Sequence, residues 1–181
     1  MDRTDHLARF EESILPHMDA AYNLARWLAR SDFDAQDIVQ EAYLRAFRFF
    51  AGFRGNDGRP WLLRIVRNTF YSWLEKNRRG EATIPADETE DIGSEDAIPE
   101  KLLIREADSK LLHQAIEELP IEFREVLVMR ELEGMSYKEI ADVAGLPIGT
   151  VMSRLARARR MLRQRLTEHP GGKEQNELQR G

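Results

Sequence analysis

Cysteine is absent from the 181-residue sequence, and no apolar run approaches the roughly 18 residues that a membrane-spanning helix needs. Without cysteine the chain has no disulfide, no thiolate nucleophile and no zinc site of the cysteine type, which is typical of a cytoplasmic protein. The first ten residues carry acids and a histidine where a signal peptide would have a basic start and an apolar stretch. We therefore expect a cytoplasmic protein that does not insert into a membrane.

Patterns typical of enzymes are also scarce. The four histidines, at positions 6, 17, 113 and 169, lack the spacing of metal ligands. Gly-Gly-Lys at 171–173 lacks the pattern of a phosphate-binding loop. We expect no enzymatic activity, no metal site and no cofactor.

The net charge of −5 conceals an uneven distribution. Residues 59–80 hold six basic residues and one acidic, and residues 135–181 hold nine basic and five acidic, whereas residues 81–100 hold eight acidic and no basic. Arginine outnumbers lysine by 22 to 5, and arginine is better suited to forked contacts with phosphate and guanine. The acidic total therefore does not exclude nucleic acid as a partner.

The acidic segment marks the main boundary of the chain. Residues 81–101 are rich in acids, proline and glycine and poor in large apolar residues, so we expect a flexible, extended linker. It separates a domain at 1–80 from a second at 102–168, each small but long enough to fold alone. Residues 169–181 form a polar tail.

Both domains are predicted to be helical, so the expected fold is all-α. Asp34 is the expected cap of the second helix, and Pro60 suits the first turn of the third. In the second domain we expect one helix over 102–119, ended by Pro120, and another that stops at Gly134. Apolar residues of the first domain recur at helical spacing at Ile14, Met18, Ala21, Tyr22, Ala25 and Leu28, at Ile38, Ala42, Leu44 and Phe47, and at Trp61, Leu62, Ile65 and Val66.

The strongest motif lies at residues 135–165. Ser136 and Glu139 form a capping box, Gly145 ends the short helix that follows, and a second helix begins after Pro147. Between residues 151 and 165 there are six arginines and no acid, which favours DNA over a merely solvated basic face. We expect this helix-turn-helix to place the second helix in the major groove. The residues expected to contact DNA are Thr150, Ser153, Arg154, Arg157 and Arg160.

A second basic segment, residues 59–79, mixes arginines with aromatic side chains. Such a mixture suits unpaired nucleic acid, because basic residues follow the backbone and aromatic rings stack on bases. The alternative is that most of the aromatics belong to the core. Asn68 and Thr69 compete for backbone hydrogen bonds, so we expect a local break in the helix and a polar pocket for a flipped base.

A third feature is the acidic face of residues 31–47. Asp34, Asp37 and Glu41 share one side of the predicted helix, with Gln40 beside them. The face indicates either docking of a basic protein partner or simply a capped, solvated helix.

Together the three segments resemble the extracytoplasmic function (ECF) group of bacterial sigma factors. The residues that carry the resemblance are DAQDIVQEAYLRAF, RPWLLRIVRNTFYSWLEKNRR and LPIEFREVLVMRELEGMSYKEIADVAGLPIGTVMSRLARARRML, in the family's order and spacing. The resemblance implies two domains, sigma-2-like and sigma-4-like, that bind core RNA polymerase and promoter DNA. It also implies control in a stress or envelope response by an anti-sigma factor.

The resemblance assigns roles to the three groups of residues. Asp37, Gln40 and Glu41 would bind the polymerase clamp, and the sigma-4-like helix-turn-helix would read the −35 element. Trp61, Arg64, Asn68 and Thr69 would lie in the segment that melts the −10 element, with Asn68 near the flipped base.

Two other functions are compatible with parts of the sequence. A sigma-like decoy that only titrates an anti-sigma factor would have no need of two arginine-rich faces. A stand-alone helix-turn-helix repressor would leave the aromatic-basic segment and the acidic face unexplained.

Overall fold

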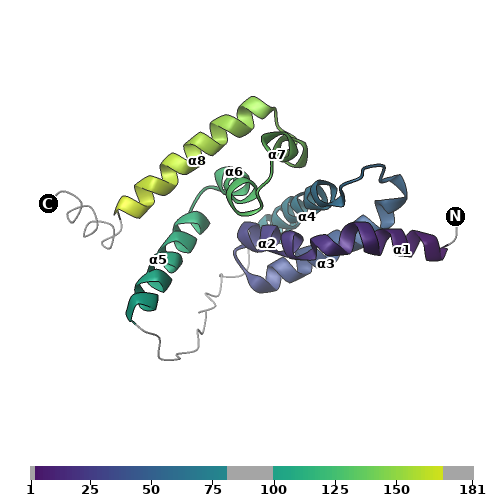
Figure 1. Ribbon diagram of the computed structural model, residues 1–181, viewed down its shortest axis with the longest axis horizontal. Helices are drawn as coiled ribbons and strands as arrows, with labels where there is room; N and C mark the ends of the chain where they lie inside the picture. The colour runs from purple at the N-terminus through teal and green to yellow at the C-terminus, as the bar shows by residue number, and fades with distance from the viewer. Residues whose placement is uncertain (1–2, 81–99, 169–181) are drawn as a thin grey trace.

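A computed structural model of the chain describes residues 3–80 and 100–168, and all regular elements in these two ranges are helical (Figure 1). The predicted all-α fold of two helical domains is confirmed. The first domain comprises α1 (Arg3–Ile14), η1 (Leu15–His17), α2 (Met18–Ala29), α3 (Asp32–Phe49), η2 (Phe50–Gly52) and α4 (Gly58–Gly80). The second comprises α5 (Glu100–Glu117), α6 (Ile121–Leu127), the π-helical turn η3 (Val128–Leu132), α7 (Tyr137–Ala144) and α8 (Ile148–Glu168).

The predicted linker and tail fall largely outside the described residues, which omit 81–99 and 169–181. Helix α5 begins at Glu100, so the last two residues of the predicted linker belong to a helix. None of the helices within 3–80 and 100–168 combines the length and the apolar character needed to cross a bilayer.

The core of the first domain lies where α2, α3 and α4 pack together. Most residues predicted to share an apolar face are buried, Ile14, Leu28 and Val66 among them. Three are exposed instead: Met18 by 48%, Leu44 by 57% and Phe47 by 41%. The buried side of α3 is formed instead by Ala35, Ile38, Ala42 and Ala46, whose spacing of three and four residues keeps them on one stripe.

Helix caps explain where α3 begins and where α7 begins and ends. Ser31, not Asp34, caps α3: its extended backbone lets the hydroxyl accept a hydrogen bond from the Asp34 amide at 3.3 Å. The predicted capping box of α7 is confirmed, since the Ser136 hydroxyl accepts from the Glu139 amide at 3.1 Å and the Glu139 carboxylate accepts from the Ser136 amide at 2.7 Å. Gly145 ends α7 at φ +66°, a conformation that glycine adopts without steric cost.

The predicted helix-turn-helix is formed by α7 and α8. Val151, Leu155 and Ala158 bury one side of α8, which packs against α6, α7 and α5. The arginines of α8 are partly or fully exposed.

The two domains are in contact. Helix α4 packs against α7, and α2 packs against α6, as the adjacent ribbons in Figure 1 show. The buried apolar residues of both domains form one continuous cluster.

Candidate DNA and polymerase interfaces

The residues predicted to read DNA are gathered on the first half of α8. Thr150, Ser153, Arg154 and Arg157 line one pocket of about 320 Å³, together with Glu122 and Phe123 of the α6 region. Arg160 is exposed on the same helix but does not line this pocket. The structure therefore brings together four of the five side chains that the sequence predicts.

Contacts within the second domain fix several of these side chains. The guanidinium of Arg157 lies 5.4 Å from the ring centroid of Phe123, which is a cation–π contact, and the residue is exposed. The Ser153 hydroxyl donates to the Thr150 carbonyl at 3.0 Å. The Nη1 atom of Arg154 lies 4.0 Å from the buried carboxylate of Glu125.

The predicted melting residues occupy different environments along α4. Arg64 and Asn68 are exposed one turn apart. Trp61 is half-buried, with its ring 5.0 Å from that of Phe53. Thr69 is 2% exposed, so its hydroxyl is not on the open surface of the helix.

The predicted break at Asn68 and Thr69 is wrong, because α4 is continuous through both. The Thr69 hydroxyl donates to the Ile65 carbonyl at 2.7 Å, and the Ser72 hydroxyl donates to the Asn68 carbonyl at 3.0 Å. These side chains thus bond to carbonyls one turn back instead of displacing the helical hydrogen bonds.

Thr69 reaches a pocket that lies between α3 and α4 and has a volume of about 270 Å³. Asp37 and Glu41 line the same pocket, with Trp73 and Lys76 on the α4 side. Two predicted polymerase-binding carboxylates and one predicted melting residue therefore share one small site, a proximity that the sequence did not reveal.

The acidic face of α3 is exposed at Asp37, Gln40 and Glu41. Arg45 donates to the Glu41 carboxylate at 2.8 Å. This hydrogen bond is the main reason that the pKa of Glu41 is lowered, and the nearby positive charges of Arg48 and Lys76 act in the same direction. Glu41 therefore keeps its negative charge at neutral pH.

An apolar groove of about 1100 Å³ adjoins this face, and sequence reasoning missed it. Gln40 stands on its wall, so the groove and the acidic face share a residue. The sequence did contain an indication of this groove, because α3 carries a second row of large apolar residues. The sequence analysis assumed one apolar face for the helix and assigned such residues to the core. The apolar lining comprises Phe10, Met18, Tyr22, Val39, Tyr43, Leu44 and Phe47.

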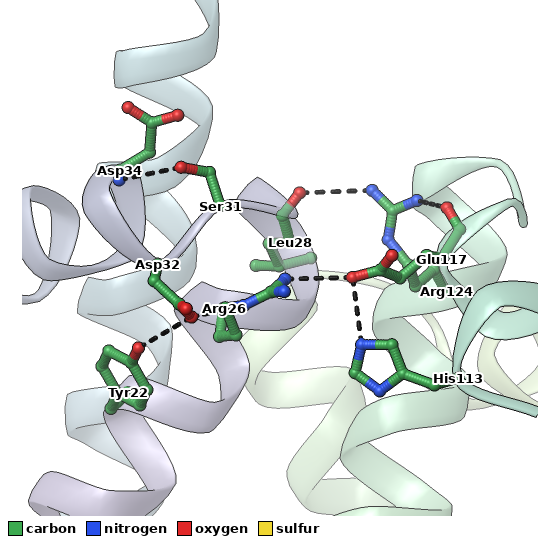
Figure 2. Close-up of polar contacts among 9 residues, drawn as sticks. All are labelled: Tyr22, Arg26, Leu28, Ser31, Asp32, Asp34, His113, Glu117 and Arg124. Carbon is green, nitrogen blue, oxygen red and sulfur yellow. Dashed lines mark hydrogen bonds and ion pairs between the residues drawn. The ribbon is translucent and has the colours of Figure 1, made fainter. Parts of the chain in front are cut away.

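Charged side chains join the two domains, and none of these contacts was predicted. Arg67 of α4 donates to the Glu125 carboxylate at 2.7 and 3.0 Å. Arg26 of α2 donates to Glu117 of α5 at 3.0 Å, as Figure 2 shows. The partners are 58 and 91 residues apart in the chain. The one available signal was a glutamate, Glu125, directly before the apolar run at 126–129.

Arg124 forms the most enclosed polar contact between the domains (Figure 2). Its guanidinium donates to the carbonyls of Glu117, Leu119 and, across the interface, Leu28, at 2.7, 2.9 and 3.2 Å. Burial lowers the pKa of Arg124, and repulsion from Arg30 adds to the effect. Arginine nevertheless stays charged, because its ordinary pKa is far above neutral.

No ligand set for a metal is found among the residues that the structure describes, where histidine and carboxylate side chains nowhere gather in threes. The arrangement offers nucleic-acid and protein contacts: two basic helices, one acidic helix face and one apolar groove.

Two protein-family models match this combination of helices and surfaces. The family model described as Sigma-70 region 2 matches residues 14–80, and that described as Sigma-70, region 4 matches residues 109–162. The first match covers α2 to α4 and the second covers the helix-turn-helix. The chain therefore has the two-part organisation of a sigma factor, a class of transcription initiation factor.

Comparison with curated relatives identifies the group of sigma factors to which the chain is similar. The chain is 38% identical to the ECF RNA polymerase sigma-E factor of Escherichia coli over 70% of either chain, and 37% identical to the RNA polymerase sigma-H factor of Pseudomonas aeruginosa over 70% of this chain and 69% of the relative. It is 34% identical to the ECF RNA polymerase sigma factor SigE of Mycolicibacterium smegmatis over 88% of this chain, and the match spans 62% of that relative's length. The chain belongs to the ECF RNA polymerase sigma factors.

Solved structures agree in fold over both domains. The sigma factor RpoE from Bartonella quintana, in complex with the anti-sigma factor NepR, matches with a TM-score of 0.69 and 27% identity over 88% of this chain and 98% of that one. CnrH, in complex with the cytosolic domain of CnrY, matches with a TM-score of 0.60 and 26% identity over 87% and 86%. The resemblance seen in the sequence is confirmed at the level of family and fold.

Proposed function

We propose that this protein binds core RNA polymerase and directs it to promoters through their −10 and −35 elements. The observation that carries the proposal is the presence, in one chain of this family, of both Sigma-70 regions with an exposed basic surface on each. In this assignment the protein acts in the cytoplasm, where polymerase and promoters are found, and has no catalytic activity of its own.

The −35 element is read by the first half of α8. Thr150 and Ser153 contact phosphate at the start of the helix, whereas Arg154, Arg157 and Arg160 extend along it toward base edges. The position of Arg157 supports this role, because Phe123 orients the guanidinium and arginine pairs in a forked manner with guanine.

The −10 element is melted along α4. Exposed Asn68 contacts the flipped base, Arg64 contacts the backbone one turn away, and the half-buried Trp61 supplies an aromatic edge. Thr69 contributes from inside the helix packing: its hydroxyl is bonded to Ile65, and it reaches nucleic acid only through the 270 Å³ pocket that it lines.

The polymerase clamp binds the acidic face of α3. Asp37, Gln40 and Glu41 are all exposed, and the lowered pKa of Glu41 keeps that carboxylate charged for pairing with basic residues of the partner. The adjoining apolar groove adds the surface that a well-packed protein interface needs at its centre.

An anti-sigma factor regulates the protein in this proposal. The supporting observation is that a solved structure similar to this chain is the sigma factor RpoE in complex with the anti-sigma factor NepR. The apolar groove of the first domain suits an amphipathic helix, which would bury its apolar side against the lining residues.

The decoy and repressor alternatives are less well supported. A decoy needs no surface for reading DNA, whereas four residues that line the α8 pocket are among those predicted to contact DNA. A repressor needs no surface for polymerase, whereas the residues predicted to bind polymerase are exposed on α3, next to α4.

Transcription in vitro tests the proposal. Purified protein mixed with core polymerase should give specific transcripts from a cognate promoter, whereas core polymerase alone should not. A pull-down in which the protein fails to retain core polymerase would contradict the sigma assignment. Retention without transcription from any promoter would favour the decoy.

A further inference from the structure

The exposed side of α8 carries a row of apolar side chains among its arginines. Ile148, Met152 and Ala156 follow one another at intervals of four residues, so they lie on one stripe of the helix. All three are exposed, and Ile148 and Met152 are 46% and 51% exposed. Packing within the second domain does not account for this apolar row, because α8 is buried through another side.

The apolar row lies next to the polar residues that are proposed to read DNA. Ser153 and Arg157 are exposed beside it on the same helix. Arg154 follows Met152 by two positions, and a turn of about 100° for each residue places the two on opposite flanks of the helix. Arg154 lines the pocket next to α6, whereas Met152 does not. The exposed side of α8 therefore has a polar flank at the pocket and an apolar flank on the other side.

The charges around the apolar row indicate which partner it contacts. Residues 148–167 contain arginines and no acidic residue, so the partner of this side of α8 is expected to be negatively charged. It must also offer an apolar group that fits among the arginines. The major groove of DNA offers both, because phosphates border it and the C5 methyl group of thymine projects into it. The edges of adenine, guanine and cytosine present hydrogen-bonding groups there and no methyl group.

Gly149 indicates that this side of α8 meets its partner at close range. A Cβ atom at this position would have no other protein atom within 4 Å, and the residue is not among the glycines with positive φ. The fold therefore does not require glycine here, and glycine destabilises a helix relative to alanine. Close approach of a partner to the backbone explains the residue. Gly149 lies one turn before Ser153, so this approach is on the exposed side that carries the apolar row.

We propose that Met152 reads a thymine in the −35 element through contact with the C5 methyl group of the base, with Ile148 and Ala156 completing the apolar surface around it. This inference rests on the proposed function and names the base chemistry of its −35 site. Methionine suits such a contact, because its side chain is unbranched and adapts to the shape of its neighbour. A rise of about 1.5 Å for each residue places Met152 about 7.5 Å from Arg157 along α8. The thymine therefore lies within about three base pairs of the base that Arg157 reads, at about 3.4 Å for each step.

Replacement of thymine by uracil tests the inference, because it removes the C5 methyl group and leaves base pairing intact. The holoenzyme, formed from the full chain and core polymerase, first selects its preferred promoter from duplexes randomised at the −35 element. Each thymine of the selected element, on either strand, is then replaced singly by uracil, and the two duplexes compete for the holoenzyme. We expect one of these replacements to weaken binding about fourfold, the ratio that corresponds to one buried methyl group.

Two substitutions at Met152 separate apolar contact from side-chain length. Met152→Gln keeps the length and the helix propensity but ends in a polar amide, so this variant should bind the thymine and uracil duplexes equally. Met152→Leu keeps an apolar side chain and should retain most of the preference for thymine. The matched control is Gln164→Ala, an exposed position further along α8, which should discriminate as the wild type does.

Three results would overturn the inference while leaving the proposed function intact. They are a selected −35 element without an A·T pair, a wild type that tolerates every uracil, and a Met152→Gln variant that still prefers thymine. A loss of binding by Met152→Gln that is equal on selected and scrambled elements would also overturn it, and would assign the apolar row to a protein contact. Failure of the wild type to retain core polymerase is a separate result, which refutes the proposed function and this inference with it.

Discussion

The guanidinium of Arg67 and the carboxylate of Glu125 form an ion pair between the two domains that is held by two hydrogen bonds. Nε lies 2.7 Å from Oε2, and Nη2 lies 3.0 Å from Oε1. Burial alone lowers the pKa of Arg67, but the hydrogen bonds and the attraction from Glu125 outweigh burial and raise it overall. The geometry of the pair is the forked one in which arginine binds carboxylate most strongly.

Arg67 and Glu125 should be strongly coupled in a double-mutant cycle. We expect Arg67→Met and Glu125→Gln, alone and combined, to give an interaction energy of about 1–3 kcal/mol from urea denaturation, because residues in one buried network are not additive. The control is the pair Glu75 and Arg79, two exposed side chains on α4. Its interaction energy should be about 0.3–0.5 kcal/mol. Equal values for both pairs would show that the interface pair adds no stability.

Arg157→Ala should weaken binding to the −35 element by about 1–3 kcal/mol, the loss expected for an arginine that reads a base. Fluorescence anisotropy on the cognate duplex and on a scrambled duplex measures this loss. Arg163→Ala, an exposed arginine further along α8, is the matched control and should reduce affinity for both duplexes alike. A loss for Arg157→Ala that is the same on both duplexes would mean contact with phosphate only.

Asn68→Ala should impair promoter opening more than formation of the closed complex, because the amide contacts the base only after it has left the stack. Permanganate footprinting of unpaired thymines measures opening, and a gel shift measures the closed complex. Glu75→Ala, exposed on the same helix, controls for general effects on α4. An unchanged footprint for Asn68→Ala would disprove this role.

Glu41→Gln should reduce the affinity for core polymerase severalfold, with a larger effect at low salt. The lowered pKa of Glu41 gives the expected pH dependence. The charge is present above the lowered pKa and is lost only as the pH falls through it, so wild-type affinity should not change through titration of Glu41 between pH 8 and pH 6. Glu11→Gln on α1 is the control. Equal affinities for the wild type and both variants would exclude Glu41 from the interface.

Ser136→Ala should lower the stability of the second domain by about 1 kcal/mol, because the α7 capping box loses the acceptor for the Glu139 amide. Thermal unfolding followed by circular dichroism measures the change. Gly145→Ala should also destabilise, by about 1 kcal/mol, since its φ of +66° disfavours a side chain. Ser153→Ala on α8, where the hydroxyl only bonds back to Thr150, should change stability less.

Local features were predicted well from the sequence. The capping box at Ser136, the stop at Gly145 and the helix that begins near Pro60 depend on residues within a few positions of each other, and the structure contains all three. The cap of α3 was predicted at Asp34 but lies at Ser31, because either residue suits a cap and the backbone conformation decides between them.

Features that depend on packing between helices were predicted less well. Leu44 and Phe47 satisfy the spacing of an apolar face, yet both are exposed beside the groove. Thr69 was predicted as a DNA contact from its position in the melting segment, and only the packing of α3 against α4 shows that its side chain is buried.

The sequence by itself determined most of the helices, the capping box of α7 and the signs of charge on α3, α4 and α8, because these properties are local. It also carried the family resemblance, since the motifs keep a recognisable order. Only the tertiary structure decided that Arg67 and Arg154 meet at Glu125. The physical reason is that an ion pair between residues 58 positions apart leaves no periodic trace in the chain and depends wholly on how the two domains pack.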